Sequence, residues 1–127
     1  AAFGSFVGEN ASDHTGFSLA GIGSIYGTGY AEILIGAIGA NSGAGEVYLF
    51  HAKGTSTGYS GSNSLSLANA FYTGDSSSNI GRSIYGGMDS DGDGTKEIVL
   101  ISHDENFDSS STGFNGYFDV IFVEPKY

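Results

Sequence analysis

The stretch from residue 89 to residue 97 carries the residue types and the spacing best suited to chemistry. It reads Asp-Ser-Asp-Gly-Asp-Gly-Thr-Lys-Glu, so carboxylates occupy positions 1, 3, 5 and 9 of a nine-residue loop, with glycines at positions 4 and 6. Carboxylates this close repel one another unless a cation neutralises them. Ca²⁺ takes about six to eight oxygen ligands in flexible geometry, whereas Mg²⁺ tends to keep several waters. The loop therefore predicts a calcium site with these ligands: the side chains of Asp89, Asp91 and Asp93, the backbone carbonyl of Thr95, and the carboxylate of Glu97.

Other interpretations of the acidic residues stay open at this point. The loop is not an EF-hand, because that motif requires a carboxylate at position 12, where this chain has Leu100. A solvated acidic turn is the competing interpretation, since Asp-Gly is common in turns. A second acidic group consists of Asp104, Glu105 and Asp108. For that group a solvated loop and a weak second cation site are both compatible with the sequence.

The loop belongs to the second of two copies of one unit. At an offset of 65 residues, positions 16–19 (GFSL) align with positions 81–84 (GRSI). Further along, positions 43–50 (GAGEVYLF) align with positions 116–123 (GYFDVIFV) at an offset of 73. The second copy is therefore predicted to carry about eight extra residues, placed in a loop.

The first copy has lost most of the acidic pattern. The positions equivalent to the three aspartates hold Ser24, Tyr26 and Thr28, and only Glu32 retains a carboxylate. The glycines persist at Gly27 and Gly29, so the loop shape is expected to be kept without an ion. One calcium ion per chain is the resulting prediction.

The elements that must position the loop are predicted to be strands, because the apolar runs are short, β-branched and bounded by glycine or polar turns. No stretch shows a helical period with a cap and a stop. The predicted strands are residues 17–22, 32–37, 47–50 and 64–72 in the first copy, and residues 82–87, 97–102 and 120–123 in the second. Residues 53–63 (KGTSTGYSGSN) are expected to be a connector.

Four strands in a repeated unit are typical of a β-propeller blade, with a β-sandwich as the alternative. The segments Gly81-Arg82-Ser83, Gly36-Ala37-Ile38 and Gly45-Glu46-Val47-Tyr48-Leu49 flank the loops and the apolar strands in a recurring order. Together with the acidic loop they resemble the FG-GAP repeat, which builds the propeller of integrin alpha subunits. The resemblance implies that the calcium loop is structural and braces the turn between two strands.

The expected architecture is an all-β chain of two four-stranded antiparallel β-propeller blades, at about residues 8–73 and 74–127. Propellers close with about four to eight blades, so a larger propeller is expected, completed by oligomerisation or by further sequence. The second blade lacks an outer strand of its own. Residues 1–7 are predicted to supply such a strand to a neighbouring blade, which would produce a ring or a fibre.

Composition limits the class of partner. The 127 residues carry 14 acidic and 4 basic side chains, and the net charge of -10 argues against binding to nucleic acid. The absence of cysteine excludes disulfides and thiolate metal sites. No apolar run approaches the ~18 residues of a membrane span. Low charge with abundant glycine, serine and aromatic residues favours a secreted or cell-surface protein.

These observations predict a calcium-stabilised extracellular module, non-enzymatic, with an adhesion-type or structural role and a protein or glycan ligand. A self-assembling filament or surface-layer subunit is one alternative. A hydrolase or lyase on a propeller is another. A glycosidase would require two carboxylates roughly 5–10 Å apart in a pocket.

Overall fold

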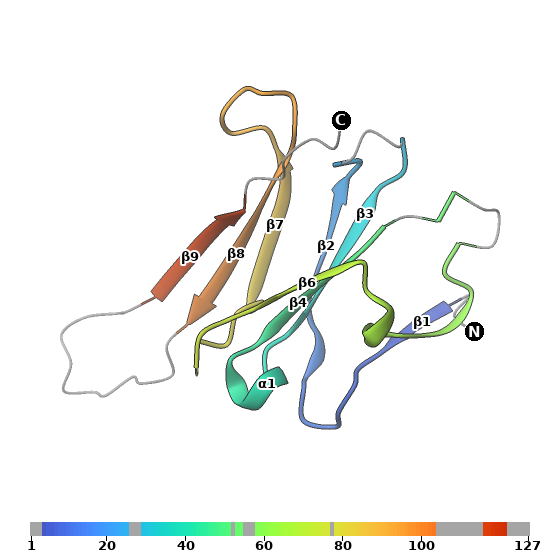
Figure 1. Ribbon diagram of the computed structural model, residues 1–127, viewed down its shortest axis with the longest axis vertical. Coiled ribbons are helices and arrows are strands. Elements are labelled where there is room, and N and C mark those ends of the chain that lie inside the picture. The colour runs from blue at the N-terminus through green and yellow to red at the C-terminus, as the bar shows by residue number, and fades with distance from the viewer. Residues whose placement is uncertain are drawn as a thin grey trace.

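The computed structural model describes residues 4–25, 29–51, 53–54, 58–76, 78–103 and 116–121. The chain is all-β, with two antiparallel sheets side by side and one short parallel pair of strands (Figure 1). The first sheet has the order β2-β3-β4-β6 and the second the order β7-β8-β9. Their strands are β2 (Thr15–Gly23), β3 (Glu32–Ala37), β4 (Glu46–Phe50), β6 (Ala70–Thr73), β7 (Ser83–Met88), β8 (Glu97–His103) and β9 (Gly116–Ile121).

The smaller elements lie beside the first sheet. Strands β1 (Gly4–Val7) and β5 (Gly61–Ser64) pair in parallel. A single helical turn, α1 (Ala40–Gly43), connects β3 to β4, and a 3-10 turn (Leu65–Leu67) follows β5. Within the described ranges no helix has the length and hydropathy to cross a bilayer.

The two sheets share one backbone register, as the offset of 65 predicts. Five residue pairs between β2 and β3 recur, 65 positions later, between β7 and β8. In the first sheet the pairs are Ser18 with Gly36, Leu19 with Ile35, Ala20 with Leu34, Gly21 with Ile33 and Gly23 with Glu32. In the second sheet they are Ser83 with Ile101, Ile84 with Leu100, Tyr85 with Val99, Gly86 with Ile98 and Met88 with Glu97. Each pairing has a register shift at the same place, just before the partner of the glutamate. The acidic loop and its counterpart in the first copy therefore leave equivalent strands.

The turn that leads into each sheet is also repeated. His14 and Asn79 have φ values of +52° and +50°, and Gly16 and Gly81 have φ values of +84° and +89°. Glycine adopts this left-handed region without the steric cost that other residues incur. The duplication thus extends from sequence to backbone conformation.

The third strand of the second sheet corrects the predicted alignment. Ile33 pairs with Phe50 in the first sheet, and its equivalent Ile98 pairs with Ile121 in the second. Phe50 and Ile121 are 71 residues apart, so the predicted offset of 73 is wrong by two. The insertion is six residues rather than about eight. Side chains alternate with a period of two, so a slip of two residues preserves both faces and leaves no trace in the hydrophobic pattern.

The predicted strand over residues 64–72 is wrong in its middle. The Ser64 side chain accepts a hydrogen bond from the Ser66 N–H at 3.2 Å and caps the 3-10 turn that separates β5 from β6. The turn buries Leu65 and exposes Leu67. The sequence pattern of alternating polar and apolar residues, which predicted a strand, therefore fits the turn as well. The predicted connector, residues 53–63, also contains the first residues of β5.

One apolar cluster lies between the two sheets. Its members are Ile22, Ile25, Leu34, Val47 and Leu49 from the first copy and Ile80, Ile84, Ile98 and Leu100 from the second. Strand β2 can lie against β7 because Gly86 has no side chain. A Cβ atom at Gly86 would lie 2.4 Å from Cγ2 of Ile22.

The opposite face of the first sheet carries a second cluster. It consists of Ile35, Ala37, Ala40, Tyr48, Phe50 and Leu65, with Phe6 and Tyr59 packed against it. The Phe6 ring centroid is 4.8 Å from that of Phe50 and 5.0 Å from that of Tyr59. In this structure β1 is therefore held by its own chain. The exchange of residues 1–7 with a neighbour stays a prediction.

Candidate metal centre

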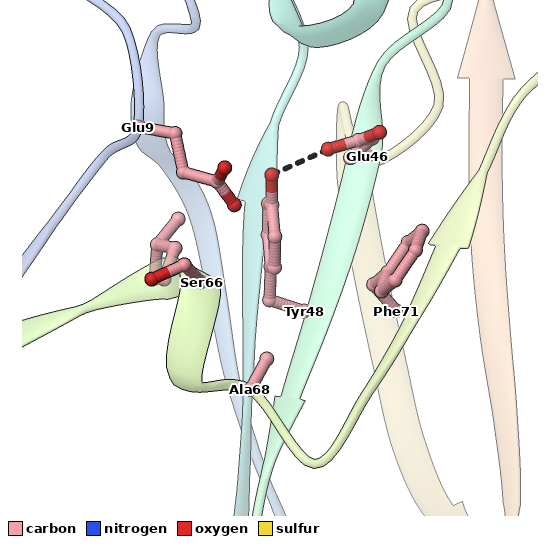
Figure 2. A pocket seen from close by; sticks show the side chains of 7 residues that line it. Glu9, Glu46, Tyr48, Ser66, Ala68 and Phe71 are labelled. Atoms are coloured by element: carbon pink, nitrogen blue, oxygen red, sulfur yellow. Dashed lines mark hydrogen bonds between the residues drawn. The ribbon is translucent and has the colours of Figure 1, made fainter.

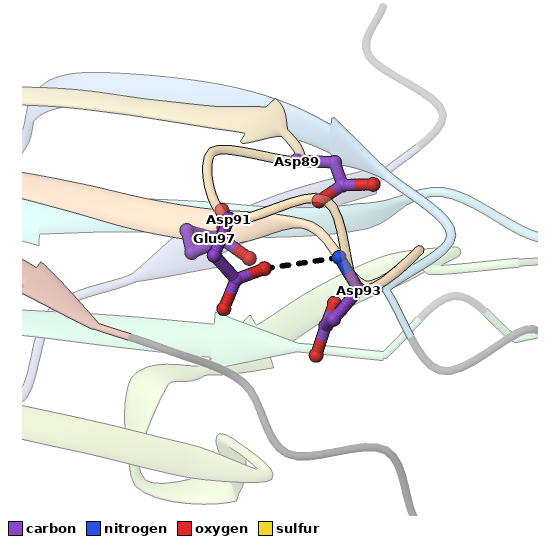
Figure 3. A group of neighbouring side chains, drawn as sticks. All are labelled: Asp89, Asp91, Asp93 and Glu97. Carbon is purple, nitrogen blue, oxygen red and sulfur yellow. Dashed lines mark hydrogen bonds between the residues drawn. The ribbon is translucent and has the colours of Figure 1, made fainter.

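The turn between β7 and β8 gathers four carboxylates (Figure 3). One oxygen from each of Asp89, Asp91, Asp93 and Glu97 lies within 4.8 Å of the others. The three aspartates are exposed, whereas Glu97 is only 1% exposed. The geometry makes the group a candidate site for one metal ion.

Backbone N–H groups of the loop turn the aspartates inward. The two oxygens of Asp89 accept hydrogen bonds from the N–H groups of Gly92, at 2.7 Å, and Gly94, at 2.9 Å. Gly92 and Gly94 have φ values of +83° and +88°, which glycine adopts without strain. The glycines at positions 4 and 6 of the loop thus allow the backbone to wrap around its own acidic side chains.

The remaining aspartates are held in the same way over shorter distances along the chain. Asp91 accepts from the N–H of Asp93 at 3.1 Å, and Asp93 accepts from the N–H of Thr95 at 2.6 Å. Each of these bonds uses one oxygen of the carboxylate. The second oxygen of each side chain is left for a ligand.

Glu97 is the first residue of β8 and closes the loop from the buried side. Its Oε2 accepts hydrogen bonds from the Ser90 N–H at 2.5 Å and from the Ser90 hydroxyl at 2.6 Å. A buried carboxylate is stable only if it is hydrogen-bonded or paired with a cation. Both hydrogen bonds reach the same oxygen, Oε2.

The charge of the group is not balanced by the described part of the protein. No Lys or Arg within the described ranges forms an ion pair with these carboxylates. Two like charges 4 Å apart repel by about 1 kcal/mol in bulk water and by more near a protein surface. A divalent cation would remove this repulsion. The all-oxygen donor set suits a hard cation such as Ca²⁺ or Mg²⁺.

Four of the five predicted ligands are therefore brought together. Thr95 is buried, and its N–H is hydrogen-bonded to Asp93. The part of its carbonyl as a ligand stays a prediction. The second acidic group, Asp104, Glu105 and Asp108, lies outside the described residues.

The equivalent loop of the first copy keeps the frame and lacks the acidic cluster. The N–H of Ile25 donates to Oε2 of Glu32 at 2.8 Å, as that of Ser90 does to Glu97. The N–H of Gly29 donates to the Ser24 hydroxyl at 3.0 Å, in place of the bond from Gly94 to Asp89. Tyr26 and Thr28 lie outside the described residues.

The second oxygen of Glu32 lies near a histidine side chain. Nδ1 of His51 lies 4.0 Å from Oε1 of Glu32. Among the described residues, no other group of three or more Asp, Glu or His side chains could share an ion. In the first copy a histidine that follows β4 therefore lies close to the glutamate of the loop.

Sequence reasoning missed a cavity on the first sheet, lined by residues far apart in the chain. Glu46 and Tyr48 alternate along β4 and so share a face, which is the one local signal that the sequence offers. The Tyr48 hydroxyl donates a hydrogen bond to Glu46 (Figure 2). Glu9 reaches the same cavity from the loop that precedes β2. No short-range pattern connects Glu9 to β4.

Comparison of the sequence with protein-family models finds no match, and comparison with curated proteins finds no significant match either. The resemblance to the FG-GAP repeat therefore stays a prediction.

Proposed function

We propose that this chain is a calcium-stabilised, non-enzymatic module of an extracellular protein, in which the ion braces the turn between β7 and β8. The proposal rests on one observation: four carboxylate oxygens converge within 4.8 Å of one another at that turn. Ca²⁺ is favoured over Mg²⁺ because the ligands come from a wound, glycine-containing loop rather than from a rigid octahedral cage.

The position of the loop supports a structural role for the ion. Asp89 directly follows β7 and Glu97 begins β8, so an ion held by both would tie the ends of two paired strands together. The ligands belong to the loop itself and are fixed by its own N–H groups. Stabilisation of the loop between β7 and β8 needs no substrate pocket.

The repeated register supports the further proposal that the two sheets are propeller-type blades. Both have the same pairs, the same register shift and the same left-handed turn residues 65 positions apart. This is what a duplicated blade with one occupied and one vacant ion loop would give. The proposed role in adhesion, with a protein or glycan ligand, rests on the resemblance to integrin-type repeats alone.

Isothermal titration of the full chain with CaCl₂, and separately with MgCl₂, tests the calcium proposal. We expect one calcium site per chain and weaker binding of magnesium. Asp91→Asn removes one ligand charge at an exposed position and should weaken calcium binding by at least about tenfold, since even residues outside the ligand shell affect affinity by that factor. Asp75→Asn makes the same charge change at an exposed aspartate outside the loop and should leave binding unchanged.

The titration has two outcomes that would overturn the proposal. One is the absence of calcium binding by the unchanged chain. The other is equal loss of affinity in the two variants, which would indicate attraction to the net negative charge rather than a site. Thermal unfolding with calcium and with a chelator gives an independent measure. At a calcium concentration a hundred times Kd, binding should add about 2.7 kcal/mol to the free energy of unfolding.

A further inference from the structure

The first sheet carries a cavity of about 330 Å³ on the face that points away from the second sheet. Its lining residues are Glu9, Glu46, Tyr48, Leu65, Ser66, Ala68 and Phe71. The volume lies at the lower end of the range for small-ligand sites. None of these residues belongs to the acidic loop between β7 and β8, so the cavity is a separate feature of the molecule.

Three parts of the chain build the cavity (Figure 2). Strand β4 supplies Glu46 and Tyr48, and β6 supplies Phe71, which is the register partner of Tyr48. The two rings lie 6.3 Å apart. The 3-10 turn and the residue after it supply the apolar wall formed by Leu65 and Ala68. Figure 2 shows the carboxylates of Glu9 and Glu46 directed toward the hydroxyl end of Tyr48 from two sides.

The loop that presents Glu9 is held in place by a buried aspartate. Asp13 is 6% exposed and accepts a hydrogen bond from the Asn10 N–H at 2.8 Å. The carbonyl of Asp13 accepts one from the Gly39 N–H at 3.0 Å, which ties the loop to the connection between β3 and β4. The position of Glu9 beside the cavity is therefore part of the fold.

The cavity is negatively charged and has no basic side chain in its lining. Glu46 accepts hydrogen bonds from two neutral hydroxyls, that of Tyr48 and, at 3.2 Å, that of Thr73. Glu9 forms no ion pair with a described residue. Burial first, and then the hydrogen bond to Glu46 and the charges of Glu46, Glu9 and Asp13, raise the pKa of Tyr48 above its usual value. The phenol of Tyr48 therefore stays protonated and neutral, and the negative charge of the two carboxylates is not compensated within the lining of the cavity.

We propose that this cavity binds an organic cation of the alkylammonium class. The ammonium group would lie between the carboxylates of Glu9 and Glu46 and donate hydrogen bonds to them. Such charge-assisted hydrogen bonds are stronger than those between neutral groups. The alkyl part would pack on Leu65 and Ala68. The ring of Phe71 is 66% exposed at the rim and presents a face that attracts cations.

Other ligand classes fit less well. A hard divalent cation needs about six to eight oxygens, and the lining offers two carboxylates, one of which is already hydrogen-bonded twice. An anion would be repelled by both carboxylates. A protonated amine on an apolar chain matches the charge and the apolar wall together.

Three probes on the full chain test the proposal by NMR titration at about 0.15 M salt, where long-range attraction is screened. The probes are n-butylammonium, N-acetyl-lysine methylamide and n-butanol. We expect both ammonium probes to shift the amide signals of Ser66, Ala68 and Phe71 in a saturable way, and n-butanol to leave them unchanged. Stronger binding of the lysine probe would identify a peptide side chain as the source of the ammonium group. Equal binding would show that the cavity recognises the alkylammonium group without a peptide backbone, and weaker binding of the lysine probe would identify a free amine.

Matched variants make the test specific to the cavity. Glu9→Gln lies on the surface, so the fold should survive, and we expect it to weaken ammonium binding by at least tenfold. Asp75→Asn should have no effect. Equal binding of n-butanol, equal loss in the two variants, or no saturable shift with either ammonium probe would overturn the proposal. Because no calcium ligand lines the cavity, each of these results is independent of the calcium titration.

Discussion

Glu32 and Glu97 are equivalent residues that accept the same backbone hydrogen bond but lie beside different side chains. Each is 1% exposed, and each accepts a hydrogen bond through Oε2 from the N–H seven residues earlier. That bond closes the loop in both copies. The first copy makes this bond without the three aspartates, so the bond does not require the acidic cluster. A cation bound by the aspartates of the second copy would add to the stability that this bond provides.

Glutamine substitutions at Glu32 and Glu97 distinguish the stability that comes from the hydrogen bond within each loop from the stability that a bound ion would add. In chelator, Glu32→Gln should lower the free energy of unfolding by about 1 kcal/mol, because a bond to a charged acceptor becomes a bond to a neutral one. Glu97→Gln should be at least as stable as the unchanged chain there, since it also relieves repulsion from three aspartates. With calcium, only Glu97→Gln should lose the added stability. Urea unfolding in both buffers checks this, and loss of the calcium increment in Glu32→Gln would contradict it.

The phenol of Tyr48 should make stability depend on alkaline pH. Its pKa is raised from 10.0 in the fold, chiefly by burial, so above that pH the unfolded chain binds fewer protons than the folded chain. The stabilisation is complete below pH 10 and is lost as the pH rises further. Tyr48→Phe should make the decline less steep. Some decline should remain, because burial also raises the pKa of Tyr59. Unfolding in urea from about pH 9 to pH 11 measures the slope, and identical slopes would refute the assignment.

At the scale of elements, much of the sheet structure could be predicted from the sequence. The predicted strand over residues 32–37 matches β3, and the offset of 65 gave the correct register for both pairs of inner strands. Glycines and acidic residues at fixed spacing anchor that alignment. The same spacing identified the four carboxylates that the fold brings together.

Other elements left no usable signal. The pairing of β1 with β5 is parallel and joins two strands of four residues that are 57 positions apart, with the sequences GSFV and GSNS. Glycine and serine carry little strand preference, and parallel partners need no turn between them. The cavity was missed for a related reason, because Glu9 reaches β4 only through this folding of the N-terminal segment.

The equivalent glycines Gly21 and Gly86 should respond in opposite ways to the same substitution. A Cβ atom at Gly86 would lie 2.4 Å from Ile22 and push β7 away from β2, whereas nothing lies within 4 Å of one at Gly21. Gly86→Ala should cost about 1–3 kcal/mol, as overpacking does. Gly21→Ala should be neutral or slightly stabilising, because alanine has less freedom to lose on folding. Thermal unfolding of the two variants measures the difference, and similar melting temperatures would argue against the close packing of β2 on β7.

At the scale of the whole molecule, the two sheets stack front to back. Ala20 and Leu34 lie on the face of the first sheet that packs against Ile84 and Leu100 of the second. Their own equivalents in the second sheet are Tyr85 and Val99. Tyr85 is 61% exposed, and Leu19, the equivalent of the buried Ile84, is 65% exposed. The stack thus presents unlike apolar surfaces at its two ends.

Unlike ends predict association of the chain head to tail, with the Tyr85 surface of one copy on the Leu19 surface of the next. Native mass spectrometry in calcium buffer should show oligomers, either of one discrete size for a closed ring or of many sizes for a fibre. Tyr85→Lys should shift the population toward the 13.0 kDa monomer. Asp75→Asn, which also makes the net charge one unit more positive, at an exposed residue of the turn between β6 and β7, is the matched control. A monomeric unchanged chain would contradict the prediction.

The shared register also bears on how a gene for such a protein can change in length. A duplicated stretch of 65 codons encodes a sheet whose inner pair of strands has the same register and whose packing face has the equivalent positions. A newly added sheet can therefore pack against the preceding sheet without changes elsewhere in the chain. Each addition contributes its own stability and one more interface, as in other repeat proteins. Unequal recombination can thus vary the number of sheets, while point substitutions such as those between residues 24 and 32 decide which of them keep the acidic cluster.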